Sequence, residues 1–142
     1  MTKALFFDID GTLVSFETHA IPASTIEALT IAHEKGIKIF IATGRPKAII
    51  NNLADIQDRG LIDGYITMNG AYCFVGDEVI YKSAIPAGEV RALAKVCEQK
   101  GYPCIFVGEH TISVCQPNKL VHDIFYDFLH VDEIPVKTFE EA

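Results

Sequence analysis

The chain has 142 residues, close to the usual size of a single domain, and 49% of them are hydrophobic while 22% are charged. This composition excludes wholesale disorder, and no apolar run approaches the ~18 residues that a membrane span needs. Twelve basic against nineteen acidic residues give a net charge of −7, which disfavours nucleic acid and anionic membranes as partners but leaves a small anionic substrate open.

The first residues lead straight into an apolar run of strand length, without the longer apolar region of a secretory signal, so we expect a cytoplasmic protein. Three runs have the length and composition of buried strands: residues 4–9, 37–42 and 65–67. Amphipathic segments lie between them, and we expect Ser24 to cap the first helix and Pro46 to begin the second. This alternation predicts an α/β fold with a doubly wound parallel sheet.

The pattern changes after residue 70. Residues 71–75 and 78–82 flank Gly76-Asp77, which predicts a β-hairpin. Beyond it we expect a helix that ends at Gly101, then two strands at residues 104–107 and 111–115, then a helix over 120–129. We therefore expect two domains, 1–82 and 83–142.

Asp8 and Asp10 directly follow the first predicted strand and are followed by Gly11 and Thr12. Residues two apart in a strand face the same side, so both carboxylates can converge at the carboxyl end of the sheet, where open α/β sheets bind ligands. Two close carboxylates repel each other unless a cation lies between them, and such oxygen ligands suit Mg²⁺. The alternative is an ordinary Asp-Gly turn with a solvated carboxylate.

Two further segments follow the next two strands. Thr43, Gly44 and Arg45 could form a phosphate seat, from a hydroxyl, free backbone N–H groups and a guanidinium fork. The alternative is a capped helix whose arginine points to water. Asn69 could donate to a substrate oxygen or serve only an Asn-Gly turn. The four cysteines lack zinc-site spacing, so we expect buried, reduced thiols.

Together, these segments resemble the haloacid dehalogenase-like phosphohydrolases of the Cof-type subgroup. The resemblance runs from about Lys3 to Lys82 and continues more loosely from Ile85 as the opening part of an α+β cap. It implies a Mg²⁺-dependent phosphatase that hydrolyses a small phosphorylated metabolite, such as a sugar phosphate, through an aspartyl-phosphate. It leads us to expect the following site residues: Asp8 as nucleophile, Asp10 as general acid and base, Asp8 and the Asp10 backbone carbonyl as Mg²⁺ ligands, Gly11, Thr43 and Gly44 at the phosphate, and Arg45 and Asn69 at the substrate.

The chain departs from the family pattern in one respect. The family's later lysine and its G-D-x-x-N-D motif are not found, since Gly76-Asp77 is followed by Glu78 and Val79. We therefore expect the N-terminal part of a longer enzyme, with an incomplete core that bares the edge of the first strand and could self-associate. The open alternatives are a non-catalytic remnant that binds phosphate or a partner, and a receiver-like module that holds its phosphate on an aspartate.

Overall fold

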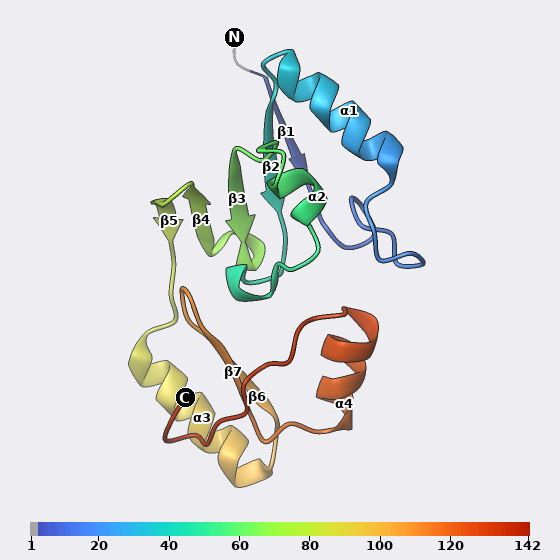
Figure 1. Ribbon diagram of the computed structural model, residues 1–142. Coiled ribbons are helices and arrows are strands. Elements are labelled where there is room, and N and C mark those ends of the chain that lie inside the picture. Colours follow the sequence, from blue (N-terminus) through green and yellow to red (C-terminus); the bar gives the residue numbers. More distant parts are fainter. Residues whose placement is uncertain (1–2) are drawn as a thin grey trace. The chain divides into compact units, whose positions relative to one another are not determined.

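The computed structural model describes residues 3–142 and divides into two compact units (Figure 1). The first unit runs to Pro46 and resumes at Ile50–Ser83. The second unit comprises Ala84–Ala142 and the short segment Lys47–Ile49, which lies far from the rest of that unit in the sequence. No helix in the described part of the chain is both long enough and apolar enough to cross a membrane.

A five-stranded sheet forms the centre of the first unit, with its strands in the order β1-β2-β3-β4-β5. The strands are β1 (Ala4–Phe7), β2 (Lys38–Ala42), β3 (Gly64–Thr67), β4 (Tyr72–Val75) and β5 (Glu78–Lys82). β1, β2 and β3 are parallel, whereas β4 and β5 add an antiparallel hairpin. The predicted α/β class, the three parallel strands and the hairpin are therefore confirmed, because short apolar runs separated by long crossovers favour parallel pairing.

β1 lies at the edge of this sheet. Its apolar composition predicted burial on both faces, but the side chains of Leu5 and Phe6 are 39% and 57% exposed. Phe6 stacks on Phe40 of β2, its partner in the parallel register, with ring centroids 5.0 Å apart. Among the described strands, β1 pairs only with β2, so its other edge is not covered by strand pairing.

The helices of the first unit differ from the prediction in their limits. Helix α1 covers Ala23–Glu34, so the cap lies at Pro22 and Ser24 falls inside the first turn. The carbonyl of Pro22 accepts the N–H groups of Thr25 and Ile26, which begins the helix before Ser24 can cap it. The single helix predicted after Pro46 is instead a 3₁₀ turn, η1 (Lys47–Ile49), and a short helix, α2 (Ala54–Gln57).

The second unit follows the predicted order of helix, two strands and helix. It contains α3 (Ala87–Lys100), the antiparallel pair β6 (Cys104–Val107) and β7 (Ile112–Cys115), α4 (Lys119–Val121) and the π-helical turn η3 (His122–Phe128). Its buried core comprises Ile49, Val114, Val121, Val131 and Ile134. Ile49 joins this core although the chain around it belongs to the first unit, which explains why Lys47–Ile49 is part of the second.

Candidate active site

The loop after β1 places Asp8 and Asp10 on either side of a fully buried residue, Ile9. The carbonyl oxygen of Ile9 accepts the backbone N–H groups of three following residues, at 3.2 Å from Thr12, 3.0 Å from Leu13 and 2.9 Å from Val14. Asp8 is exposed, while Asp10 is partly buried. The buried isoleucine and the converging hydrogen bonds fix the backbone of both aspartates.

Gly11 permits the tight turn that follows Asp10. Its φ is +78°, a left-handed conformation that residues with a Cβ rarely adopt. A Cβ at this position would lie 2.5 Å from Cε2 of Phe16, well inside van der Waals contact. The backbone N–H of Gly11 donates to the carbonyl of Val14 at 2.9 Å. The left-handed φ therefore favours glycine, and an added Cβ would also require the exposed ring of Phe16 to move.

The loops after β1 and β2 meet in an ion pair between Asp10 and Arg45. The guanidinium donates from Nε to Oδ2 at 2.8 Å and from Nη2 to Oδ1 at 2.9 Å, so both carboxylate oxygens are bound. The Arg45 side chain is 4% exposed and that of Asp10 is 22% exposed. The alternative in which Arg45 points to water is therefore wrong, and the two sequence motifs lie at the same edge of the sheet, as predicted.

Thr43 lies buried beside this pair, at the end of β2. Its backbone N–H donates to the carbonyl of Ile66 at 2.9 Å, which ties it to β3. Its hydroxyl oxygen accepts the backbone N–H of Arg45 at 3.0 Å. Because the hydroxyl acts as acceptor in this bond, its own proton can be donated to an anionic oxygen.

Asn69 joins the same group of loops from the end of β3. Its backbone N–H donates to the carbonyl of Thr43 at 3.2 Å, and both Met68 and Asn69 have a left-handed φ of 53°. A Cβ at Gly44 would lie 3.2 Å from Oδ1 of Asn69, so the Asn69 amide lies directly over Gly44. Left-handed residues other than glycine store strain and cluster at functional sites. The loops after three neighbouring strands therefore converge.

Asp8 is the predicted site residue that these contacts leave out. Its exposed carboxylate has no hydrogen bond or ion pair with residues 3–142, and Asp10 has Arg45 as its counterion. The donor set is compatible with Mg²⁺, which prefers oxygen ligands and keeps several waters. The Asp8 carboxylate and the Asp10 backbone carbonyl would hold the ion, as the family resemblance implies.

Sequence reasoning missed Asn51. Its Oδ1 accepts a hydrogen bond from Nη1 of Arg45 at 3.3 Å, so three nitrogens of the guanidinium are bound to side chains. The contact of Asn51 with Arg45 was not predicted because we expected a continuous helix across Asn51. The adjacent pair Asn51-Asn52 could have signalled otherwise, since asparagine competes with the helical backbone for hydrogen bonds and favours turns.

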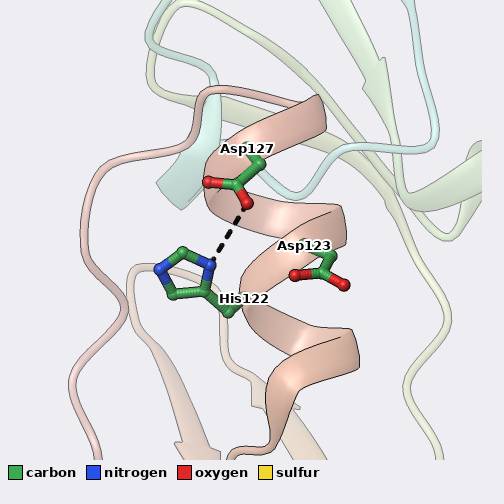
Figure 2. A group of neighbouring side chains, drawn as sticks. All are labelled: His122, Asp123 and Asp127. Atoms are coloured by element: carbon green, nitrogen blue, oxygen red, sulfur yellow. Dashed lines mark ion pairs between the residues drawn. The ribbon is translucent and has the colours of Figure 1, made fainter.

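A separate group of side chains lies on η3 in the second unit (Figure 2). Ligand atoms of His122, Asp123 and Asp127 lie within 4.8 Å of one another, and Nδ1 of His122 is 3.4 Å from Oδ2 of Asp127. Asp123 is already paired with Lys119, at 2.5 Å between Nζ and Oδ2. The side chains of His122 and Asp127 are more than 60% exposed, so the group is a solvated surface cluster.

The four cysteines are free thiols, as predicted, but only Cys115 is buried; Cys73, Cys97 and Cys104 are partly exposed, so the predicted burial is wrong for these three. Burial raises the pKa of the Cys104 thiol to about 11, with contributions from the hydrogen-bonded Cys97 and from Cys115 across the β6–β7 pair. Burial also raises the pKa of Cys115. A thiol with a raised pKa carries little thiolate at neutral pH and is a poor nucleophile. Cys104 and Cys115 are therefore structural residues.

Comparison with known proteins places the chain among hydrolases. A sequence model of the haloacid dehalogenase-like hydrolase family matches residues 5–141. A solved structure described as the HAD subclass IIB sugar phosphatase BT4131 is 78% identical, with a TM-score of 0.89 over 99% of this chain. The phosphatase BT1666 from Bacteroides thetaiotaomicron is 35% identical, with a TM-score of 0.76 over 99% of the chain.

The chain spans about half the length of these relatives: 54% of the BT4131 chain and 51% of the BT1666 chain. Among curated proteins, "Putative phosphatase YkrA" of Bacillus subtilis (strain 168) is 32% identical over 111 residues, which are 78% of this chain and 42% of YkrA. The family match covers the loops of the candidate site as well as the second unit. The chain therefore belongs to the haloacid dehalogenase-like hydrolase family.

Proposed function

We propose that the complete protein, with the family's later lysine and acidic motif, is a Mg²⁺-dependent phosphatase that hydrolyses a small phosphorylated metabolite, in the class of sugar phosphates. The observation that carries this proposal is that Asp10, Arg45 and Thr43 converge at one edge of the sheet. The exposed carboxylate of Asp8 lies two residues before Asp10 in the same loop. The substrate class rests on the 78% identity to BT4131, which is described as a sugar phosphatase.

In this proposal Asp8 is the nucleophile. A carboxylate oxygen of Asp8 attacks phosphorus, the bond from phosphorus to the ester oxygen breaks, and a phosphoryl group remains on Asp8. The hydroxyl of Thr43 donates to a phosphoryl oxygen, while the backbone N–H groups near Gly44 provide further donors. Bound Mg²⁺ would reduce the repulsion between the Asp8 carboxylate and the phosphate dianion.

Asp10 acts as general acid and then as general base. For the first step Asp10 must be protonated: it gives this proton to the departing ester oxygen and becomes a carboxylate. In the second step the carboxylate removes a proton from the water that hydrolyses the phosphoryl-aspartate, which restores the protonated acid. The hydrogen bonds from Arg45 do not block this role, because each carboxyl oxygen keeps a further lone pair. The guanidinium therefore orients Asp10 without using up its capacity to carry a proton.

An assay of the complete protein against a panel of phosphorylated metabolites tests the proposal. We expect hydrolysis of at least one sugar phosphate with Mg²⁺ and none after removal of the metal with EDTA. Asp8→Asn should abolish turnover, whereas Asp77→Asn, an exposed aspartate in the β4–β5 turn, should keep it. Full activity of Asp8→Asn would contradict the assignment of the nucleophile.

The same assay separates the two other functions that the sequence left open. A non-catalytic remnant would bind inorganic phosphate or a partner without turnover. A receiver-like module would keep a stable phosphoryl group after treatment with acetyl phosphate, without releasing phosphate. The family match over residues 5–141 favours the phosphatase, because it extends through the second unit, which a receiver module lacks.

A further inference from the structure

Arg45 and Asn51 flank the short segment that the chain contributes to the second unit. The chain leaves the first unit after Pro46, places Ile49 in the second unit's core, and returns at Ile50. The hydrogen bond from Nη1 of Arg45 to Oδ1 of Asn51 joins the two ends of this excursion within the first unit. Asn51 is thus held next to Arg45, although it lies between η1 and α2 and belongs to neither.

The guanidinium is planar, so the directions of its nitrogens are fixed relative to one another. Nε and Nη2 bind the two carboxylate oxygens of Asp10, and Nη1 binds Asn51 on another side of the same plane. With three nitrogens held, rotation about the end of the side chain breaks at least one bond. Without Asn51, a turn of the plane about one of its bonds to Asp10 breaks one hydrogen bond fewer.

We propose that Asn51 is a positioning residue, which holds the Arg45 guanidinium in the orientation that binds both oxygens of Asp10. This inference rests on the proposed function, in which Asp10 donates a proton to the ester oxygen. An amide suits the position because its oxygen accepts a hydrogen bond without a negative charge that would compete with Asp10 for Arg45. Asn51→Asp should therefore disturb the pair more than Asn51→Ala does.

Leaving-group dependence distinguishes this role from a general loss of structure. Proton donation speeds the departure of a sugar or alkyl alcohol, but p-nitrophenolate departs readily without a proton. The quantity to compare is kcat/KM, since it covers only the steps up to the first phosphoryl transfer. We expect Asn51→Ala to lower kcat/KM about tenfold for a sugar phosphate and less than about threefold for p-nitrophenyl phosphate, a modest part of the usual contribution of a general acid.

Gln57→Ala is the matched control. It also removes an amide side chain of the first unit that makes one described hydrogen bond, from Nε2 to the Tyr65 hydroxyl at 2.9 Å, but it does not contact Arg45. It should change kcat/KM for both substrates equally or not at all. Equal losses for both substrates in Asn51→Ala, or no loss for either, would overturn the proposal.

A second measurement decides the question without catalysis. In ¹⁵N NMR spectra of the whole chain, the Nε–H of Arg45 should exchange slowly with water, because it is buried and bound to Asp10. We expect Asn51→Ala to speed this exchange at least about fivefold and Gln57→Ala to leave it unchanged. An unchanged exchange rate in Asn51→Ala refutes the positioning role, whereas an inactive complete protein whose Arg45 Nε–H shows the expected exchange pattern refutes the proposed function alone.

Discussion

Replacement of Arg45 by methionine should strongly destabilise the first unit. The arginine side chain is 4% exposed and its partner Asp10 is 22% exposed, so Arg45→Met leaves a partly desolvated carboxylate without its counterion. Breaking a fully buried ion pair from one side costs about 3–5 kcal/mol. Because Asp10 keeps some access to water, we discount this to about 2–3 kcal/mol.

Hydrogen exchange of the β2 amides (Lys38–Ala42) is the appropriate assay, because the chain has two units and global unfolding need not be a single transition. The expected loss corresponds to roughly 30- to 160-fold faster exchange, at 1.36 kcal/mol for each factor of ten. Arg59→Met, at an exposed arginine of the same unit, should stay within about 0.5 kcal/mol of the wild type. Acceleration below about fivefold in Arg45→Met would refute the reasoning.

Three further predictions concern the turn after β1, the partly buried carboxylate of Asp63 and the exposed edge of the sheet. Gly11→Ala should cost at least about 1–2 kcal/mol in urea unfolding, from the left-handed φ and the contact with Phe16, and an unchanged midpoint would contradict this. Burial alone would raise the pKa of Asp63, but hydrogen bonds from Lys38 and the Ile39 N–H hold that pKa below its ordinary value. A depressed pKa stabilises the fold above the unfolded carboxyl pKa of about 3.9 and loses this effect as the pH falls through the folded pKa. Unfolding free energies between pH 5 and pH 2 should therefore fall more steeply in the wild type than in Asp63→Asn, and parallel curves would count against the assignment. The exposed edge of β1 should cause self-association that Phe6→Lys weakens, and sedimentation of the wild type as a stable monomer would contradict this.

The fold could be predicted where its determinants are local. Three apolar runs separated by crossovers identified the parallel strands, and Gly76-Asp77 identified the hairpin between β4 and β5. The burial of β1 could not be predicted in this way, because burial depends on which strands lie beside it. The start of α1 was missed by two residues because the Pro22 carbonyl, rather than the Ser24 side chain, accepts the first N–H groups.

In the candidate site, too, features set by local sequence could be predicted and features set by tertiary packing could not. Strand order was enough to predict that the loops bearing Asp10 and Arg45 lie at one edge of the sheet. Which oxygens the guanidinium binds depends on rotamers and burial, so spacing alone could not distinguish a substrate contact from the pair with Asp10. The hydrogen bond of Asn51 to Arg45 could not be predicted from local patterns, because the helix that the sequence predicted across Asn51 does not form and Ile49 packs in the core of the second unit.

Detection of a phosphoryl group on Asp8 tests the central claim most directly. The protein is mixed with a sugar phosphate and Mg²⁺, quenched in acid during turnover, and its peptides are analysed by mass spectrometry. We predict a phosphoryl group on the peptide that contains Asp8, in amounts that vanish when substrate is exhausted and that are absent from Asp8→Asn. Continued turnover with this peptide unmodified at every time point would contradict covalent catalysis by Asp8.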